Sequence, residues 1–388
     1  MAKWFEKRLD EIAEFNPRES LKKGSIAKKI SMDKLQPFCR DVPGFELEPY
    51  SGGTKFRNGD TIMARITPCL ENGKTAKVSV LENGEVGFGS TEYIVFRAKD
   101  GCDPDFLYYL VTSSIVRGPA IKSMVGSSGR QRVQTDVLQT LMVKVPDLET
   151  QQSISGILKS LDDKIAANRK INDNLEQQAK AIFRQELLQN GELPPNWTTG
   201  SLLDIADYLN GLAMQKFRPV DGERGLPVLK IKELRQGFCD YSSELCSPNI
   251  KPEFIVHDGD VIFSWSGSLL VDLWCGGTCG LNQHLFKVTS VKYPKWFYYT
   301  WTAHHLARFV AIAADKATTM GHIKREDLAK AEVIIPDVAS MERIGGVLQP
   351  IYDLVINQRI ENRKLSMLRD SLLPKLMSGE LDVSAIEL

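Results

Sequence analysis

The chain has 388 residues, of which 43% are hydrophobic and 25% charged, with 49 basic and 49 acidic side chains. This length predicts two or three domains, each large enough for its own core. Zero net charge gives no global argument for a nucleic-acid partner. No segment approaches the roughly 20 apolar residues of a membrane helix. The N-terminus lacks the apolar core of a signal peptide, so we expect a cytoplasmic protein without a membrane partner.

The cysteines do not form a recognisable framework. There are seven, an odd number, scattered along the chain, which indicates reduced thiols. Cys275 and Cys279, with His284 nearby, could be considered metal ligands. A structural zinc site requires four ligands at tighter spacings. We therefore expect no metal and interpret these cysteines as small buried or loop residues.

The second half of the chain repeats the first. Pro146-Asp147 recurs as Pro336-Asp337 at a spacing of 190 residues, and Gly59-Asp60 recurs as Gly259-Asp260 at a spacing of 200. A surface loop of different length explains the change in spacing. The repeat predicts a duplicated domain, each copy followed by a long helix.

The predicted elements follow in chain order. Residues 1–149 form the first domain, with strands at residues 61–66 and 93–96, Asn-Gly and Gly-Gly turns between them, and a helix at residues 104–116. Residues 150–191 form a first long helix. Residues 192–339 repeat the mixed pattern as the second domain. Residues 340–378 repeat the helix, and residues 379–388 form a C-terminal tail.

Both long helices carry an apolar stripe. Thr150 and Ser340 are the predicted N-caps. Steps of three and four residues between apolar positions give a period of 3.5, which is typical of a coiled coil, and asparagines in the stripes would fix its register. Pro374 is expected to disturb the last turn of the second helix. The predicted seam consists of Ile154, Leu158, Leu161, Ile165, Asn172, Leu175, Ile344, Leu348, Ile351, Val355, Asn362 and Leu365.

Neither helix can bury its stripe alone. We expect the two helices to form an antiparallel coiled coil with one globular domain at each end. The fold class is therefore α/β (mixed α+β), duplicated and with pseudo-two-fold symmetry. The alternative is that each stripe packs on the domain of its own helix.

The sequence contains no catalytic motif that we can identify. A phosphate-binding glycine loop ending in Lys-Ser/Thr, a Gly-x-Ser-x-Gly nucleophile turn and a dinucleotide-binding glycine loop are absent. Asp60 and Asp260 lie in turns, where aspartate is favoured for local backbone hydrogen bonds. We therefore expect a binding protein with no catalytic residue and no cofactor.

Two long stretches of the sequence contain basic but no acidic residues. Residues 106–135 and residues 273–314 each have this composition. Such stretches indicate an anionic partner. The alternative is a chance gap in the acidic residues.

The order of these segments resembles the specificity subunit of type I restriction-modification systems, over essentially the full chain. Each domain contains a Gly-Asp strand start and ends with a strand, Pro-Asp and a long helix. Pro194, Asn196 and Trp197 resemble the entry to a second copy. The opening pairs of the two domains are Leu9-Asp10 with Ile12-Ala13, and Leu203-Asp204 with Ile205-Ala206.

The resemblance implies a division of work between subunits. Each of two target-recognition domains would recognise one half of a split, asymmetric sequence in double-stranded DNA. The helices would set the distance between the domains and bind modification subunits. Two copies of a DNA methyltransferase subunit, together with restriction or translocase subunits, would carry the catalysis, the methyl donor and ATP.

Three regions in each copy are candidates for DNA contact. The loop at residues 124–138 joins a Gly-Ser turn to arginine and glutamine, which suit guanine and adenine. The second region lies around the Gly-Asp turn. The third follows Gly89 in the first copy and its match Gly280 in the second, and its corresponding segments are Thr91-Glu92-Tyr93 and Asn282-Gln283-His284. A solvated basic loop is the alternative. The candidates are Lys55, Arg57, Arg65, Thr67, Ser127, Ser128, Arg130, Gln131, Arg132, Ser264, Ser266, Asn282, Gln283, His284, Thr318, Thr319, His322, Lys324 and Arg325.

Two other functions remain open. A stand-alone DNA-modifying enzyme would require an Asn/Asp-Pro-Pro-aromatic loop and a cofactor-binding glycine loop, and the sequence has neither. A coiled-coil scaffold that joins two protein-binding modules would require neither motif. Binding to random duplex DNA distinguishes the scaffold from the specificity subunit.

Overall fold

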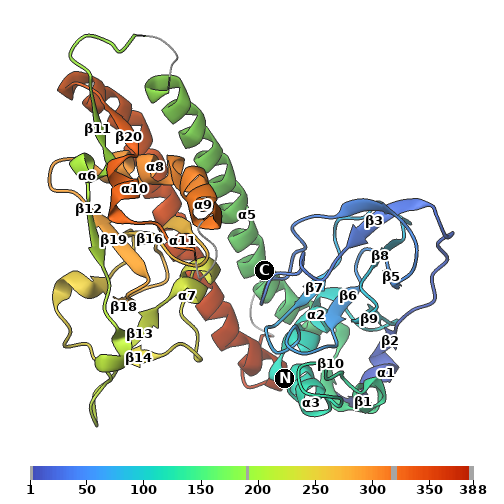
Figure 1. Ribbon diagram of the computed structural model, residues 1–388. Coiled ribbons are helices and arrows are strands. Elements are labelled where there is room, and N and C mark those ends of the chain that lie inside the picture. The colour runs from blue at the N-terminus through green and yellow to red at the C-terminus, as the bar shows by residue number, and fades with distance from the viewer. Residues whose placement is uncertain (1–2, 189–191, 316–320, 384–388) are drawn as a thin grey trace. The chain divides into compact units, whose positions relative to one another are not determined.

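The computed structural model describes residues 3–188, 192–315 and 321–383 (Figure 1). It divides into unit 1, residues 1–166 with 365–388, and unit 2, residues 167–364. The long helices α5 (Leu148–Leu187) and α11 (Val338–Ser378) each contribute one half to each unit. In the part of the chain that is described, no helix combines the length and apolarity needed to cross a membrane.

Unit 1 contains three β-sheets. The first is antiparallel, in the order β2-β9-β6-β7, and the second has the order β4-β3-β8-β5, with β3 and β8 parallel. The first and last strands of the domain, β1 and β10, form a separate antiparallel pair. The bounds are β1 (Trp4–Arg8), β2 (Ala13–Phe15), β3 (Ile26–Ile30), β4 (Glu46–Pro49), β5 (Thr54–Phe56), β6 (Thr61–Ala64), β7 (Thr75–Lys77), β8 (Gly87–Gly89), β9 (Tyr93–Ala98) and β10 (Met142–Pro146).

Unit 2 has the same three sheets with the same connections. Their orders are β12-β19-β16-β17, β14-β13-β18-β15 and β11-β20. The identical strand orders confirm the predicted duplication and the mixed α/β class. The bounds are β11 (Thr198–Ser201), β12 (Asp207–Asn210), β13 (Leu226–Leu229), β14 (Leu245–Cys246), β15 (Ile255–Val256), β16 (Val261–Ser264), β17 (Leu270–Leu273), β18 (Cys279–Leu281), β19 (Leu285–Thr289) and β20 (Glu332–Ile335).

Short helices cover the antiparallel sheet of each unit. The predicted helix at residues 104–116 is two helices, because Ser113 ends the first and caps the second. In unit 2, the aromatic residues Trp296, Phe297 and Trp301 of α8 are buried against the sheet. The short helices are α1 (Leu9–Ile12), α2 (Pro104–Thr112), α3 (Ser114–Lys122), α4 (Thr135–Gln139), α6 (Leu202–Ile205), α7 (Ile231–Gln236), α8 (Lys295–His304), α9 (Leu306–Asp315) and α10 (Arg325–Ala329), with 3-10 turns at Met214–Lys216 and Pro252–Phe254.

The repeated Pro-Asp pair starts both long helices. The Asp147 carboxylate accepts a hydrogen bond from the Thr150 amide at 3.0 Å, and the Asp337 carboxylate accepts one from the Ser340 amide at 2.7 Å. The prediction of Thr150 and Ser340 as N-caps is therefore wrong by three residues. Aspartate satisfies an amide that would otherwise lack a partner at the helix start, which explains why this pair occurs in both copies.

The apolar stripes pack in both of the ways considered. In unit 1, Ile154 and Leu158 of α5 lie in one buried cluster with Phe106 of the domain and Leu376 and Met377 of α11. Each helix therefore packs on its own domain with its first turns, and the last turns of the other helix complete that core. Burial of Leu376 and Met377 also explains why α11 continues through Pro374 to Ser378, contrary to the expected disturbance.

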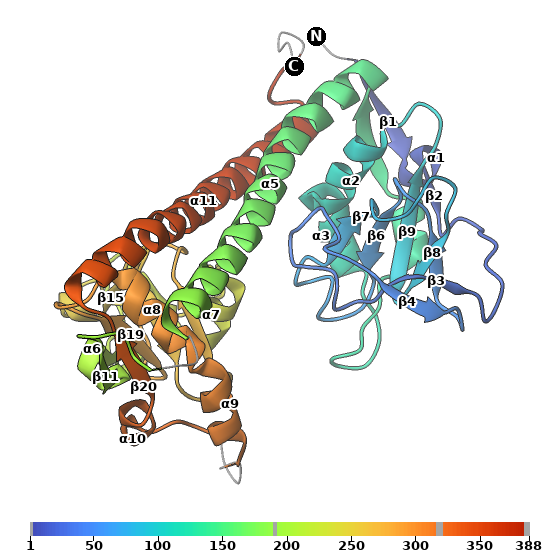
Figure 2. The same cartoon turned by 90° about the horizontal axis from the view of Figure 1, so that it is seen from above.

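In unit 2, the halves of α5 and α11 lie side by side and antiparallel (Figure 2). Glu176 pairs with Arg359 and Glu186 with Arg343, so that the residue number falls along α11 as it rises along α5. The Asn168 amide donates to the Asn362 side-chain oxygen at 2.9 Å and to Glu361 at 2.7 Å. This pairing supports the predicted role of asparagine in the register, with Asn168 in the place expected of Asn172.

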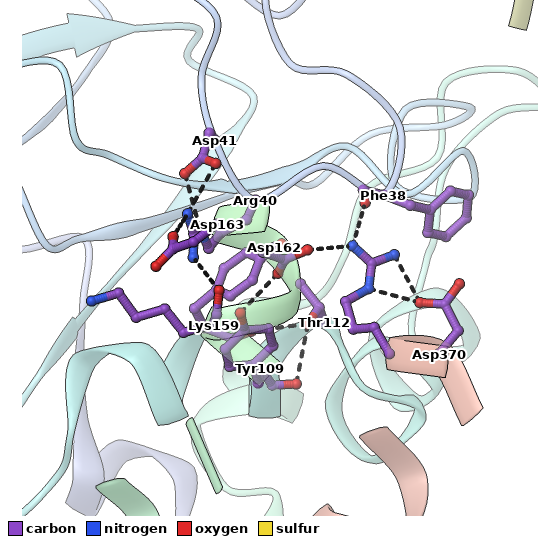
Figure 3. Close-up of polar contacts among 11 residues, drawn as sticks. Phe38, Arg40, Asp41, Tyr109, Thr112, Lys159, Asp162, Asp163 and Asp370 are labelled. Carbon is purple, nitrogen blue, oxygen red and sulfur yellow. Dashed lines mark hydrogen bonds and ion pairs between the residues drawn. The ribbon is translucent and has the colours of Figure 1, made fainter. Parts of the chain in front are cut away.

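Buried charges join the helices to the domain of unit 1 (Figure 3). Arg369 of α11 donates to Asp162 of α5 at 2.7 Å, and the Tyr109 hydroxyl donates to the other Asp162 oxygen at 2.8 Å. Arg40, from a loop of the domain, donates to Asp163 at 2.6 Å. The Asp162 side chain is only 5% exposed, so the loss of one partner would leave a charge buried without compensation.

Arg369→Met should therefore destabilise unit 1 by about 3–5 kcal/mol, because a buried carboxylate loses its ionic partner. Adding Asp162→Asn should recover much of that loss, since the asparagine oxygen can still accept from Tyr109. Urea unfolding, with hydrogen exchange of unit 1 peptides, measures both effects. Ser371→Ala, at an exposed position of the same helix, is the control. A single variant as stable as the unsubstituted protein would contradict this role of the ion pair.

Candidate functional site

The three regions proposed from the sequence meet at one place in unit 1. Arg65, directly after β6, accepts with its carbonyl from the Val133 amide at 2.9 Å and donates with its amide to the Glu92 carbonyl at 2.9 Å. The Thr67 amide donates to the Gln131 carbonyl at 3.0 Å. The end of β6, the start of β9 and the loop before α4 therefore form one surface.

A charged cluster occupies this surface. Arg132 donates from Nε to both carboxylate oxygens of Glu92 at 3.0 Å and from Nη2 to Oε1 at 2.6 Å. The Nε atom of Arg65 lies 3.9 Å from the same carboxylate. The hydrogen bonds from Arg132 lower the pKa of Glu92. Two guanidinium groups share one carboxylate, which leaves an excess positive charge.

The loop that carries Arg132 is a short hairpin. The Arg132 amide and carbonyl exchange hydrogen bonds with Val125 at 2.9 and 3.0 Å. At its tip, the side chains of Ser127, Ser128 and Arg130 are exposed. The hairpin therefore presents hydroxyl groups and a guanidinium group to solvent beside the charged cluster.

The Gly-Asp turn has a structural role. Asp60 accepts from the Arg57 amide at 2.8 Å and Asp260 from the His257 amide at 2.8 Å, while Gly59 and Gly259 have positive φ angles of 88° and 84°. The aspartates therefore close the turns, as the sequence suggested.

The predicted basic residues around the first of these turns are engaged by Glu19. Lys55 donates to the Glu19 carbonyl, and Arg57 forms an ion pair of 2.7 Å with the Glu19 carboxylate. Arg97 binds that carboxylate from another side at 2.7 Å. Lys55 and Arg57 thus bind Glu19 and are not part of the charged cluster, although the Arg57 side chain remains exposed.

Unit 2 repeats the backbone of the site with other side chains. The Ile323 amide donates to the Trp265 carbonyl at 3.1 Å and the Gly267 amide to the Gly321 carbonyl at 3.2 Å. Ser266 and His322 form an isolated antiparallel β-bridge, as Ile66 and Arg132 do in unit 1. Trp265 and His322 therefore occupy the places of Arg65 and Arg132.

The strand register identifies the third position of the site. Ala64 pairs with Tyr93 in unit 1 and Ser264 with Leu285 in unit 2, which places His284 where unit 1 has Glu92. The same register matches Gly89 with Leu281. The match of Gly89 with Gly280 predicted from the sequence is thus wrong by one residue, because the register places Gly280 at the position of Phe88.

The unit 2 site is aromatic. The Trp265 ring lies 6.2 Å from His284 and 6.2 Å from His322 between centroids, and it stacks on Phe286 at 5.6 Å. The Ser266 hydroxyl lies 3.2 Å from His284 Nδ1. The two units thus present a charged cluster and an aromatic cluster at equivalent positions.

Other predicted residues of unit 2 differ in accessibility. Ser264 is fully buried, and its hydroxyl donates to the carbonyls of Ser266 and Ser268, so it cannot meet a ligand. Asn282 is buried, and its side-chain oxygen accepts from the His284 amide at 3.2 Å. Gln283 is half-buried, whereas Lys324 and Arg325 are exposed at the start of α10. Thr318 and Thr319 lie outside the described residues.

The structure adds Glu92 and Trp265 to the site. Both lie in the candidate regions proposed from the sequence, but neither was among the individual contact residues proposed there. Cys275 and Cys279 are buried, and burial raises the pKa of the Cys275 thiol to about 11. Within the described ranges, no three metal-binding side chains come together.

Comparison with known proteins identifies relatives of the chain. Residues 1–177 match a family model described as the type I restriction modification DNA specificity domain. The chain is 26% identical over 321 residues to the Type I restriction enzyme MjaIX specificity subunit of Methanocaldococcus jannaschii, which covers 74% of this chain and 71% of that protein. It is 22% identical to the HindI specificity subunit of Haemophilus influenzae, over 88% of this chain and 89% of the relative.

A solved structure shares the fold. The S subunit of a type I restriction-modification system from M. genitalium aligns with a TM-score of 0.59 at 12% identity, over 97% of this chain and 96% of that one. At this identity the likeness concerns the fold alone. It agrees with the mixed α/β class and the long helices found here.

The Glu19 network predicts a dependence of stability on pH. Burial raises the pKa of Glu19, but hydrogen bonds from Arg97 and Arg57 bring it below the ordinary value of 4.5. A depressed pKa stabilises the fold above the pKa of the unfolded chain, and this stabilisation is lost as pH falls through the folded pKa.

Glu19→Gln should therefore cost roughly 1–3 kcal/mol of unfolding free energy at pH 7. The difference from the unsubstituted chain should shrink when the pH falls below 4.5. Urea unfolding of both proteins at a series of pH values measures this difference in unfolding free energy. Glu82→Gln, at a glutamate whose side chain is 86% exposed, is the matched control. A difference that stays constant down to low pH would show that the Glu19 charge does not matter.

Proposed function

We propose that the chain recognises a bipartite, asymmetric sequence in double-stranded DNA. In support, residues 1–177 match the model of the type I restriction modification DNA specificity domain, and the chain is similar to specificity subunits over most of its length. Its relatives are named specificity subunits, which agrees with the prediction of a non-catalytic chain. We propose that it acts in the cytoplasm, where its DNA target would lie.

One observation supports the proposal above the others. The same backbone framework occurs in both units and carries Arg65, Glu92 and Arg132 in one, but Trp265, His284 and His322 in the other. Arginine forms bidentate hydrogen bonds with guanine, whereas apolar and aromatic groups contact the thymine methyl group. Two equivalent sites with different chemistry suit two different half-sites.

The other candidate residues fit the same proposal. Ser127, Ser128 and Arg130 at the tip of the hairpin suit phosphate oxygens, and Lys324 and Arg325 are exposed for the same contacts in unit 2. Gln131 lies between Arg130 and Arg132 on the hairpin, and its carbonyl accepts a hydrogen bond from the Thr67 amide. Phosphate contacts would position each unit, and the clusters would provide base selectivity.

Partner subunits would supply the catalysis. We propose that two copies of a methyltransferase subunit, and restriction or translocase subunits, assemble on this chain. Apolar side chains exposed on the long helices offer a surface for them: Ile171, Leu354, Met367 and Leu368 are each more than 40% exposed. Ile171 lies on α5 and the other three on α11. Exposed apolar side chains are typical of contact surfaces where they form a contiguous patch.

Selection from random duplexes tests the function directly. The purified chain with its modification partner should enrich a split sequence, while the chain alone should transfer no methyl group from labelled S-adenosylmethionine. The reason is that no cofactor loop or paired catalytic group was identified in the sequence. Turnover by the chain alone would favour the stand-alone enzyme. Absence of any enriched sequence would favour the scaffold.

The long helices are proposed to set the spacing of the half-sites. Each is one continuous helix, of 40 residues in α5 and 41 in α11. Insertion of seven residues after both Asn168 and Gln358 lengthens each by ~10 Å and keeps the stripes in phase. At about 3.4 Å per base pair, the preferred spacer should grow by roughly three base pairs.

Methylation of a DNA library with varied spacers, by the complex with its modification partner, measures this change. A two-residue insertion at the same places rotates the following side chains by about 200°, which moves the stripes out of phase, and serves as the control for folding. Altered half-sites with an unchanged spacer would show that the helices do not set the distance.

A further inference from the structure

A carboxylate lies among the arginines of the surface that we propose meets DNA. An acidic group at such a surface repels phosphates and so lowers affinity for any duplex. In the described structure, the contacts of the Glu92 carboxylate are with Arg132 and Arg65. The pairing of β9 with β6 uses backbone groups instead. The Glu92 side chain therefore acts on the two arginines.

Resting on the proposed function, we infer that Glu92 is a positioning residue that makes the unit 1 site selective for a G·C base pair. It holds Arg132 in an orientation suited to guanine. It also prevents Arg132 from binding the phosphates of arbitrary DNA. Glu92 itself need not touch a base.

The geometry of the guanidinium group supports the first part. Glu92 binds Nε and Nη2 of Arg132, which is one edge of the planar fork. The edge formed by Nη1 and Nη2 keeps donors for a second bidentate contact. Guanine offers O6 and N7 as two acceptors at matching spacing. A side chain held in this orientation loses less conformational freedom on binding.

The surroundings of Arg132 support the second part. The Arg132 amide and carbonyl both form hydrogen bonds with Val125, which fixes the backbone of Arg132. The backbone of Glu92 is fixed as well, because its carbonyl accepts from the Arg65 amide and its amide donates to the Ser90 hydroxyl at 3.1 Å. A move of the guanidinium toward a phosphate would break three hydrogen bonds to Glu92. Arg130, exposed on the same hairpin, has no such restraint and suits a phosphate contact.

Unit 2 provides a control within the same molecule. The position of Glu92 is occupied by His284, and that of Arg132 by His322. The restraint on an arginine is therefore specific to unit 1. A change at Glu92 should alter one half-site and leave the other as it was.

The test uses the full chain in complex with its modification partner and duplexes randomised in both half-sites. Glu92→Gln should reduce the preference for guanine at one position of one half-site by about 5- to 100-fold. Affinity for random DNA should rise, and the slope of log affinity against log salt should steepen by about one, because Arg132 can now reach a phosphate. The second half-site should be unchanged.

Two further variants identify the route of the effect. Arg130→Ala should weaken binding evenly across sequences. Arg132→Ala should lose the same guanine preference as Glu92→Gln, and the double variant should lose no more than Arg132→Ala alone, since Glu92 acts through Arg132. Losses that add in the double variant would overturn this role and assign Glu92 a direct contact.

The outcomes separate this inference from the proposed function. If Glu92→Gln retains the full preference at every position, the inference is wrong while sequence recognition stands. If the unsubstituted complex shows no preference at all, the proposed function itself fails. Hydrogen exchange of residues 61–66 and 125–133 checks that the variant keeps the strand and hairpin, so a lost preference with normal protection supports the inference.

Discussion

The attachment of the long helices to their domains depends on arginine–carboxylate pairs that are buried in unit 1 and partly buried in unit 2. In unit 1, Arg369 and Asp162 join α11 to α5, and the Phe38 carbonyl accepts from Arg369 at 3.4 Å. In unit 2, Arg359 binds Asp272 of the domain and Glu176 of α5, each at 2.7 Å. Buried pairs contribute little net stability, but their directional bonds permit few alternative arrangements. Within each unit they fix the domain to its helices, as the proposed oriented contact with DNA would require.

The two units preserve one framework and differ in the side chains it presents. The retained parts are turn and cap residues, such as Asp60 and Asp260, which satisfy backbone amides wherever the same turn occurs. The equivalents Glu92 and His284 follow a fixed strand register but face solvent in part. Packing therefore constrains the framework, while the exposed ends of the strands can change chemistry without cost to the core. A duplicated chain can thus acquire two different sites.

The sequence predicted those features that depend on local signals. Pro-Asp, Gly-Asp and the 3.5-residue period act within a few residues, so the duplication and both helices were predictable. The N-cap was misplaced because Thr150 and Asp147 are both favoured cap residues, and only the hydrogen bond distinguishes them. The sequence indicated the three candidate regions separately. That they form one surface depends on contacts such as that between Thr67 and Gln131, which are more than 60 residues apart in the chain. No local sequence pattern predicts that Lys55 and Arg57 bind Glu19, because these residues are far apart in the chain.

Charge illustrates the difference between composition and arrangement. The acid-free stretch at residues 106–135 was interpreted as a sign of an anionic partner, yet its first part is the buried helix α2, and Arg117 donates to the Glu71 carbonyl at 2.7 Å. The absence of acids there reflects burial. The positive charge of the proposed site comes from Arg65 and Arg132, which share the Glu92 carboxylate, and from Arg130 at the tip of the hairpin. A chain of zero net charge gains little from general attraction to phosphates, so the sequence recognition that we propose would have to come from side chains held in fixed orientations.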